Sequence, residues 1–179
     1  MLVGRNITAE AVLTENHASQ LKAKIPRRIQ LEKNWKLLYS MSQHGISLHT
    51  MLRLTKGKAP LLLAIKDAGG SVFGAYLSDP FTPHPNFYGS GECFLWKVEE
   101  NDKVKVFPWT GKNDYCMLCE NEFIAVGGGD GQFGLWLDAE LENGSSSHCP
   151  TFDNDVLSSN PRFMCVELEV WCFKENPSR

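Results

Sequence analysis

The sequence predicts a mainly β (α+β) fold in which two antiparallel sheets pack as a sandwich, with a few short peripheral helices, mostly N-terminal. Two observations lead to this prediction. Apolar runs of strand length recur from residue 61 onward and are separated by Gly, Pro, Asn and Asp. Helical spacing of apolar residues is confined to the part of the chain before residue 58. Many short strands with segregated helices are typical of a sandwich with helices at its periphery.

The first helical region is expected between residues 8 and 26. Its apolar positions fit one short amphipathic helix or two, and they are Val12, Leu13, Leu21 and Ile25. Thr8 and Thr14 are the candidate N-caps, because a threonine hydroxyl accepts a hydrogen bond from the first turn of a helix. Pro26 is expected to end the region, because proline lacks the backbone N–H that a helix interior needs.

A strand over residues 35–41 and a second helix come next. His44 and Gly45 indicate a turn after the strand. Ser47 is placed to cap the helix, and Gly57 is placed to stop it.

The rest of the chain is read as strands. The expected strands cover residues 61–65, 72–77, 93–98, 103–107, 115–118, 122–126, 133–137 and 162–173. Residues 67–70 (Asp-Ala-Gly-Gly) are a hairpin signal between the first two. The last strand changes the phase of its apolar alternation once, as a β-bulge would cause. We expect one domain over residues 8–173, with flexible ends at residues 1–7 and 174–179.

Composition limits the classes of protein to which this chain can belong. A chain of 179 residues with 42% hydrophobic and 22% charged residues can bury the core of one ordinary globular domain. A net charge of −3 excludes a generally basic, nucleic-acid-binding surface. No apolar run approaches the ~20 residues of a membrane span, so membrane insertion is not expected. Six cysteines without a secretory signal indicate free, buried thiols and a cytoplasmic location.

Charge is distributed unevenly along the chain. Residues 20–36 carry six basic side chains and one acid, whereas residues 86–155 carry thirteen acids and four lysines. Such asymmetry can steer a charged partner, although a solvated helix beside solvated loops is the commoner explanation.

The stretch GGGDGQFGLWLD, residues 127–138, contains a G-x-G-x-x-G pattern at Gly129, Gly131 and Gly134. This pattern suggests dinucleotide binding, but that requires a strand that turns into a helix facing the phosphates. The residues after Gly134 leave no room for a long helix or for the rest of a doubly wound sheet, and Asp130 would repel phosphate. We therefore expect a tight connection between two strands, with some residues at positive φ, and no cofactor.

Three features are weak candidates for chemistry. Cys116 and Cys119 form a C-x-x-C, but one pair cannot complete a structural zinc site, and residues three apart in a strand point to opposite faces. Cys149 lies in a polar loop beside His148, so an exposed, oxidisable thiol is expected there. Glu92 follows a glycine turn and is either a general base or an acceptor that holds a loop. No metal site and no convincing catalytic set is predicted.

The order of several short motifs resembles the TLDc domain of the oxidation resistance proteins and of nuclear receptor coactivator 7, over about residues 10 to 173. The motifs are WKLLYS (35–40), HGISL (44–48), FGAY (73–76), FYGSGECFL (87–95), WTG (109–111), GGGDGQFGLWLD (127–138), CPTFDN (149–154), LS (157–158) and ELEVW (167–171).

The resemblance implies the same sandwich fold, a role in protection from oxidative damage, and binding to the vacuolar proton-pumping ATPase with an effect on its assembly. It brings no settled enzymatic activity. The glycine and tryptophan positions that match are Gly45, Gly74, Gly89, Gly91, Trp109, Gly111, Gly128, Gly131, Gly134, Trp136 and Trp171. The matching polar positions are Glu92, Asp138, Asp153, Asn154, Glu167 and Glu169.

Glycine shapes a backbone path and tryptophan fills a core, so these matches favour a binding scaffold over an active site. We therefore expect a noncatalytic, monomeric interaction domain, and the resemblance implies that it binds the cytosolic sector of the proton pump. Its glycine loops, including Asp130, and its sheet edges would provide the contact surface. The alternative is a direct thiol antioxidant that acts through Cys149.

Overall fold

Strands dominate the structure, and the α-helices all lie in its first third, as the sequence predicts. The computed structural model describes residues 1–173. Its strands are β1 (Leu2–Val3), β2 (Trp35–Ser40), β3 (Leu61–Asp67), β4 (Val72–Leu77), β5 (Phe94–Val98), β6 (Val104–Pro108), β7 (Met117–Cys119), β8 (Phe123–Val126), β9 (Leu135–Asp138), β10 (Asn143–Ser145) and β11 (Arg162–Cys172). Its helices are α1 (Glu15–Lys22), α2 (Arg27–Gln30), α3 (Met41–His44), α4 (Leu48–Thr55) and a 3-10 turn, η1 (Glu100–Asp102).

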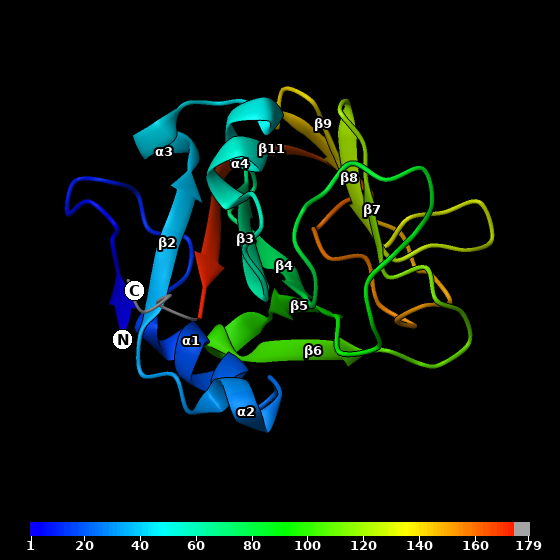
Figure 1. Ribbon diagram of the computed structural model, residues 1–179, viewed down its shortest axis with the longest axis horizontal. Coiled ribbons are helices and arrows are strands. Elements are labelled where there is room, and N and C mark those ends of the chain that lie inside the picture. The colour runs from blue at the N-terminus through cyan, green and yellow to red at the C-terminus, as the bar shows by residue number, and fades with distance from the viewer. Residues whose placement is uncertain (174–179) are drawn as a thin grey trace.

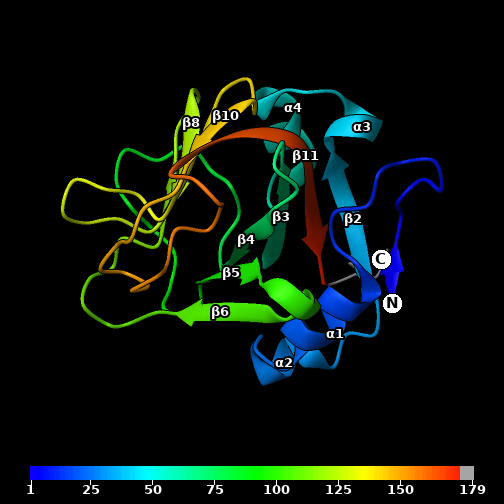
Figure 2. The same cartoon turned by 180° about the vertical axis from the view of Figure 1, so that it is seen from behind.

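The strands form one connected sheet instead of the two separate sheets that the sequence predicts. Their order is β6-β5-β4-β3-β11-β10-β9-β8-β7, with β2 also paired to β11 (Figure 1). The first residues of β11 pair with β10, and the later ones pair with β3 and β2. Figure 2 shows β11 arching from one half of the sheet to the other. The sequence cannot reveal this sharing, because a strand's partners are set by distant segments.

A bulge in β11 lies at the point where its partners change. The pairing register with β3 shifts between Cys165 and Glu167, which confirms the bulge predicted from the alternation. Val166 is 47% exposed, whereas Glu167 and Leu168 are both buried. An extra residue of this kind bends a strand and increases its twist, which accounts for the arch.

The main core lies inside the bend of the sheet. Leu61, Leu63 and Ile65 of β3 belong to the same buried cluster as Ile124 of β8 and Leu137 of β9. The two halves of the sheet therefore pack against each other, and α4 adds Leu48 and Met51 to the same cluster.

A second core lies on the other face of β3. Leu62 and Ala64 pack there with Trp96 and Trp171, under Leu21 of α1 and other residues of the N-terminal helices. Figure 1 shows α1 and α2 beside β5 and β6. Because both faces of β3 are covered, its sequence is a continuous apolar run without alternation.

Residues 1–7, expected to be a flexible end, contribute to the fold. Leu2 and Val3 pair in parallel with Trp35 and Lys36 of β2. The Arg5 guanidinium donates two hydrogen bonds, of 2.7 and 2.8 Å, to the carboxylate of Glu169. Residues 174–179, the other expected flexible end, lie outside the described residues.

Glu169 is fully buried on β11, so its charge depends on these partners. Its carboxylate also accepts a hydrogen bond of 2.9 Å from the backbone N–H of Leu13. The Arg5 guanidinium lies 5.0 Å from the centre of the Trp171 ring. A buried carboxylate is stable only when it is paired and hydrogen-bonded, so Arg5 anchors the N-terminal segment to β11.

Side-chain caps place the helices. Thr14, rather than Thr8, caps α1, because its hydroxyl accepts from the backbone N–H of His17 at 3.1 Å. Ser47 caps α4 as predicted, with its hydroxyl accepting from Thr50. Pro26 lies after the end of α1, as predicted, and it is also the N-cap residue of α2. The turn at Gly45 is the C-terminal cap of the short helix α3.

We predict that Arg5→Ala destabilises the protein by about 3 kcal/mol, because it leaves the carboxylate of Glu169 buried and unpaired. Urea unfolding at neutral pH measures this. Lys66→Ala is the matched control, because it breaks an exposed ion pair with Glu10 and is expected to cost less than ~1 kcal/mol. Equal effects of the two substitutions would show that Glu169 does not depend on Arg5.

Candidate functional site

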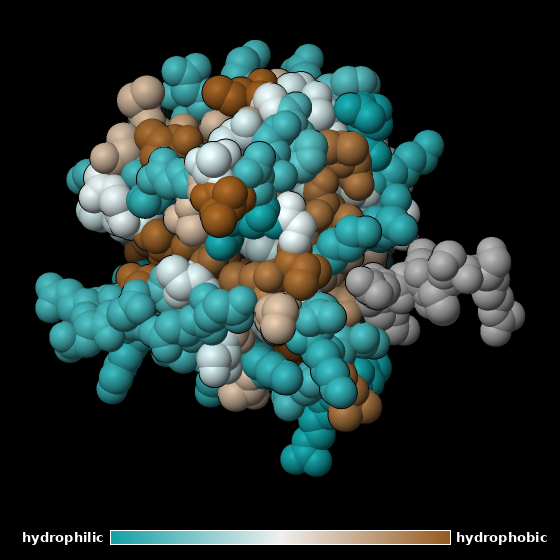
Figure 3. Space-filling model, turned by 90° about the vertical axis from the view of Figure 1, so that its left-hand side faces the viewer, coloured by the Kyte–Doolittle hydropathy of each residue, from teal (hydrophilic) through white to brown (hydrophobic). Residues whose placement is uncertain are grey.

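Four loops meet beside β7 and β8, at one end of the sheet (Figure 1). They are residues 86–93, 109–116, 127–134 and 146–155, and we call this region the loop end. A bridge between Tyr88 and Met117 joins the first loop to β7. The loop end contains most of the residues that the sequence singles out, namely Gly89, Gly91, Glu92, Trp109, Gly111, Gly128, Asp130, Gly131, Gly134, Cys149, Asp153 and Asn154. The opposite face, around β1 and β2, shows hydrophobic and hydrophilic side chains interspersed (Figure 3).

The glycine-rich stretch is a connection between antiparallel strands β8 and β9, as predicted. φ is positive at Gly127, Gly129, Asp130 and Gly131, with values of 79°, 107°, 56° and 73°. Gly134 leads directly into β9 and not into a helix. The strand-to-helix turn that a dinucleotide motif requires is therefore not formed here.

Close packing explains why two positions in this stretch are glycine. A Cβ atom at Gly134 would lie 2.8 Å from Leu95 Cδ1 of β5, across the core. A Cβ at Gly128 would lie 2.8 Å from the ring of Phe87. The absence of a side chain at both positions lets the loop approach its neighbours closely.

Thr151 links three of the four loops, and sequence reasoning missed it. Its buried hydroxyl accepts from the Gly128 N–H at 2.9 Å. The same oxygen lies 2.8 Å from Asn113 Oδ1 and 3.0 Å from the Gly128 carbonyl, either of which can accept its proton. The Thr151 carbonyl accepts from the Thr110 N–H at 2.9 Å. These bonds fix the 109–116 and 127–134 loops to the 146–155 loop.

Cys149 is buried, which corrects the expectation of an exposed thiol. Its exposed fraction is 0%, and burial raises its pKa. The loop folds over it because the Asn154 side chain satisfies the local backbone: Oδ1 accepts from the Cys149 N–H at 3.2 Å, and Nδ2 donates to Ser147 O. His148 lies against Asp153 instead, with 2.6 Å between Nε2 and Oδ1, and this hydrogen bond lowers the pKa of Asp153.

Glu92 is held by a side chain from a helix and not by backbone N–H groups. Both of its carboxylate oxygens accept from the Arg28 guanidinium of α2 at 2.6 Å. The hydrogen bond from Arg28 lowers the pKa of Glu92. A carboxylate in a bidentate pair has a lowered affinity for protons, which does not favour its use as a general base.

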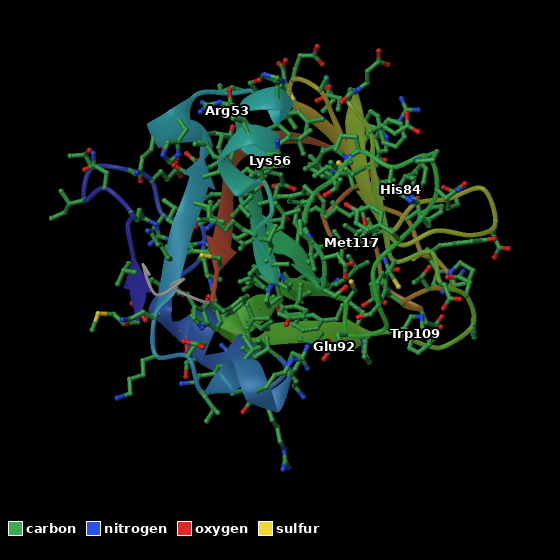
Figure 4. All side chains as sticks on the ribbon, in the orientation of Figure 1. Arg53, Lys56, His84, Glu92, Trp109 and Met117 are labelled. Carbon is green, nitrogen blue, oxygen red and sulfur yellow. The ribbon has the colours of Figure 1, made fainter. Side chains whose placement is uncertain are left out.

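Gly91 packs against the ring of Trp109. A Cβ at Gly91 would lie 2.3 Å from Trp109 Cε3, so no other residue fits there without displacing the indole. Trp109 donates from Nε1 to Asn113 O at 2.7 Å and remains 38% exposed. Figure 4 shows Glu92 and Trp109 close to β6 and Met117 in β7. Gly89, at φ 90°, approaches the Met117 side chain.

Most of the other residues that the sequence singled out lie away from the four loops. Gly111 lies in a loop, but a Cβ atom added there would meet no other atom within 4 Å. Asp138 accepts from the N–H groups of Glu142 and Asn143 and so holds the turn from β9 to β10. Glu167 accepts from the N–H groups at the start of α3. Gly45 and Gly111 have positive φ with open space around them. Gly74 and Trp171 lie within the sheet, and Trp171 is fully buried.

The two cysteines of the C-x-x-C are both buried, as expected for core residues. Cys116 lies immediately before β7, and Cys119 is its last residue. Both residues belong to the main buried core cluster. Within residues 1–173, no group of three or more His, Cys, Asp or Glu side chains is placed to hold a metal ion.

Five partly exposed aromatic rings form a continuous row, which we call the aromatic ladder: Tyr115, Phe87, Phe133, Phe123 and Trp136. Successive ring centres lie 4.8, 6.4, 6.3 and 6.2 Å apart. Phe123 and Trp136 stand on the outer faces of β8 and β9, since their strand neighbours Ile124 and Leu137 are buried in the core. Four separate segments contribute rings, so the sequence alone does not indicate that they adjoin.

Acidic residues are close in sequence to the ladder rings. Asp114, Glu120, Glu122 and Asp130 are exposed, and each lies within three residues of a ladder ring. None of them forms an ion pair with another residue of the described chain. We call these four residues the acidic rim.

The order of the motifs agrees with a comparison of the sequence against known families. The sequence pattern of the TLDc domain matches residues 7–174. The chain belongs to the TLDc domain family. It is 41% identical to Oxidation resistance protein 1 of Eremothecium gossypii over 175 residues, which cover 92% of this chain and 74% of that protein.

Two further relatives show the same similarity. Oxidation resistance protein 1 of Yarrowia lipolytica is 39% identical over 92% of this chain and 74% of its own. Nuclear receptor coactivator 7 of Mus musculus is 43% identical over 92% of this chain, which corresponds to only 17% of the coactivator. In the described part of this TLDc chain, no helix has the length and apolar content needed to cross a membrane.

We predict that Thr151→Val destabilises the protein by about 1–3 kcal/mol, because the Gly128 N–H loses its buried acceptor. Urea unfolding and hydrogen exchange at Gly128 measure this effect. Thr110→Val is the control, since its hydroxyl contacts Pro150 O and Thr151 O and accepts from the Lys112 N–H, but does not bond the Gly128 N–H; the exchange of Gly128 should therefore stay slow in this variant. Unchanged protection of Gly128 in Thr151→Val would contradict the linking role of Thr151.

The Arg28–Glu92 pair predicts a small dependence of stability on pH. Because the folded pKa of Glu92 is lowered, the pair stabilises the protein above the unfolded pKa of about 4.3 and loses its effect as pH falls through the folded pKa. Both side chains are more than a third exposed, so the difference between wild type and Glu92→Gln should be less than ~1 kcal/mol at pH 7. It should shrink toward zero in acid; a difference that grows on acidification would contradict this.

Proposed function

We propose that this TLDc domain is a noncatalytic protein-docking domain in oxidative-stress protection, and that the aromatic ladder is its contact surface. The partner we propose is the cytosolic sector of the vacuolar proton-pumping ATPase, whose assembly the domain would regulate. The proposal places the domain in the cytoplasm as a monomer. The observation that carries it is the ladder itself, a row of partly exposed rings on a framework of fixed loops.

Exposed aromatic rings support a docking role on physical grounds. Aromatic side chains are enriched among the residues that contribute most to protein interfaces, and a contiguous exposed apolar patch marks an interaction site. The ladder lies on β8 and β9 and on loops that Thr151 holds together through buried hydrogen bonds. A surface fixed before binding loses little conformational entropy when a partner docks.

The state of the ionisable groups at the loop end supports docking over turnover. The Glu92 carboxylate is held by Arg28, Asp153 is bonded to His148, and Cys149 is buried with a raised pKa. Each of the three is engaged in structure, whereas catalysis calls for titratable groups directed at a common reacting atom.

The acidic rim indicates the charge of the partner. Four exposed carboxylates that form no ion pair within residues 1–173 lie within three residues of a ladder ring, against a single lysine, Lys112, so a basic surface on the partner would complement them. Such rim charges affect the association rate and the salt dependence of binding more than the final affinity. Lys and Arg side chains of the partner could also pack over the ladder rings.

We predict that Tyr115→Ala and Trp136→Ala each weaken binding to the purified cytosolic sector of the pump by about tenfold or more, or about 1.4 kcal/mol. Biolayer interferometry with immobilised domain measures the dissociation constant. Leu31→Ala is the control, because Leu31 is 81% exposed and follows α2, which contributes no ring to the ladder. Equal affinity in ladder and control variants would contradict the ladder as the contact surface, and no binding by folded wild-type domain would contradict the partner.

A charge reversal tests the acidic rim separately. Glu120→Lys combined with Glu122→Lys is expected to slow association and to reduce the dependence of binding on ionic strength. Glu100→Lys provides the control, since Glu100 is exposed in η1. An association rate that both variants lower equally would show that the rim does not face the partner.

A further inference from the structure

We propose that the open edge of β6, the side of the strand that faces away from β5, binds an extended peptide of a partner protein. The peptide that fits is apolar on one face and acidic on the other. Within residues 1–173, β6 is the end strand of the sheet order, and β5 is the strand that pairs with it. An edge strand presents backbone groups that can pair with another chain. The inference goes beyond docking through the aromatic ladder and does not depend on it.

The hydrogen bonds at the start of β6 show which backbone groups face the open edge. In an antiparallel pair, opposed residues alternate between those that exchange hydrogen bonds and those that do not. The Glu99 N–H donates to Lys103 O at 2.7 Å, so residue 103 is bonded toward β5. The Val104 N–H instead donates away from β5, to the side chain of Gln20 at 2.9 Å. The N–H of Val104 therefore faces the open edge.

Val106 has the same orientation as Val104, because backbone groups two residues apart in a strand point to the same edge. Its N–H and C=O therefore point away from Trp96, the residue opposite it on β5. Within residues 1–173, neither group bonds to a residue outside the β5–β6 pair. Pro108, two residues further on, has no N–H, and proline is tolerated in a sheet at such an edge position. The Val106 N–H and C=O are thus available to an added strand.

Helix α1 covers the first half of the β6 edge and leaves the second half open. Gln20 binds the Val104 N–H and also donates to Asp102 O. In Figures 1 and 2, α1 and α2 lie beside the start of β6, and the strand extends beyond them toward its C-terminal end. Val106 is partly exposed and Pro108 is exposed. An added strand therefore has room beside Val106, at the centre of the open half.

One face of the open half borders an apolar hollow of about 560 Å³. Pro26, Phe94, Val106, Pro108 and Trp109 are among the residues that line it. Phe94 and Val106 belong to the second core or pack against it, so the hollow lies on that face of the sheet. A residue paired with Val106 would place its side chain on the same face, beside the hollow. An apolar side chain suits this position.

The other face of the β6 edge is basic. Lys103 and Lys105 alternate with Val104 and Val106, so their side chains lie on the opposite face. Both lysines are exposed. Lys105 is paired with Asp155, whereas Lys103 forms no ion pair within residues 1–173. Because opposite charges on neighbouring strands attract, acidic side chains suit this face of an added strand.

The same lysines disfavour a second copy of this chain as the occupant. Antiparallel pairing of two β6 edges would gather Lys103 and Lys105 of both copies on one face of the joint sheet. Charged side chains on an edge strand commonly prevent such self-association. An acidic strand converts this repulsion into attraction, so a partner peptide is the occupant that the charges favour.

The test uses a fluorescein-labelled peptide of about nine residues that alternates valine and glutamate, titrated into the folded chain and followed by fluorescence anisotropy. Two further versions carry N-methyl groups, one on its valine amides and the other on its glutamate amides. Alternate amides of a strand point to opposite edges, so methylation removes the bonds to β6 from only one version. We expect that version to bind at least about tenfold more weakly than the other. Equal affinities of the two methylated versions, or no binding of the parent peptide, would overturn the proposal.

Hydrogen exchange of the chain with and without the parent peptide locates the contact. The Val106 N–H should exchange more slowly in the complex, because it gains an acceptor. The Phe107 N–H is expected to change little, because alternation directs it toward β5 in both states. Protection of other segments with Val106 unaffected would overturn the proposal. So would a dimer of the free chain in which the Val106 N–H is already protected, since a second copy would then occupy the edge.

A charge reversal tests the basic face. Lys103→Glu is expected to weaken binding of the parent peptide by about threefold or more, because attraction to its glutamates becomes repulsion. Lys33→Glu is the matched control, since Lys33 is also exposed but lies before β2, and it should bind the peptide like the wild type. Thermal unfolding confirms that both variants are folded. Equal weakening by the two substitutions would show that the peptide does not lie along β6.

Discussion

The fold depends on β11, because this strand belongs to both halves of the sheet. Its first residues pair with β10, its later residues pair with β3, and Glu169 to Cys172 also pair with β2. The bulge after Cys165 lets one strand serve both halves by bending between them. The two buried carboxylates of β11 also bind the N-terminal part of the chain: Glu167 accepts from the start of α3, and Glu169 is paired with Arg5. The same strand thus organises the sheet and fixes the segments around it.

The loop end follows from this arrangement. Packing of the two halves around one core brings the ends of β5, β7, β8 and β9 close enough for their loops to share hydrogen bonds. Glycine at positions 128 and 134 allows the close approach, and Thr151 supplies the bonds between loops. The aromatic ladder is displayed on this framework. A surface of this kind is suited to binding a protein, since its shape is set by the core beneath it.

Local features of the fold were predictable from the sequence, whereas contacts between distant residues were not. Apolar runs of strand length between turn residues placed the strands from β2 to β9 to within a few residues, the phase change located the bulge in β11, and Ser47 marked the start of α4. In contrast, β10 has the polar sequence Asn-Gly-Ser and forms because strands pair with it on both sides.

In the candidate site, too, local features were predictable and contacts between distant residues were not. The glycine pattern correctly indicated a tight connection between strands, but the burial of Cys149 depends on the fold of the loop around Asn154. The bond from Arg5 to Glu169 spans 164 residues of sequence, and no local pattern announces it. The aromatic ladder takes its rings from four segments of the chain. These features exist only once the topology has formed.

The central claim is that the domain acts by docking through the ladder at the loop end. Hydrogen exchange of the domain, alone and in complex with the purified cytosolic sector of the proton pump, tests it most directly. The account predicts slower exchange on binding in residues 86–88, 113–116, 121–125 and 130–136, with little change in α1, α2 and β2. Slower exchange confined to the N-terminal helices or to β1 and β2, with the ladder segments unaffected, would contradict the account.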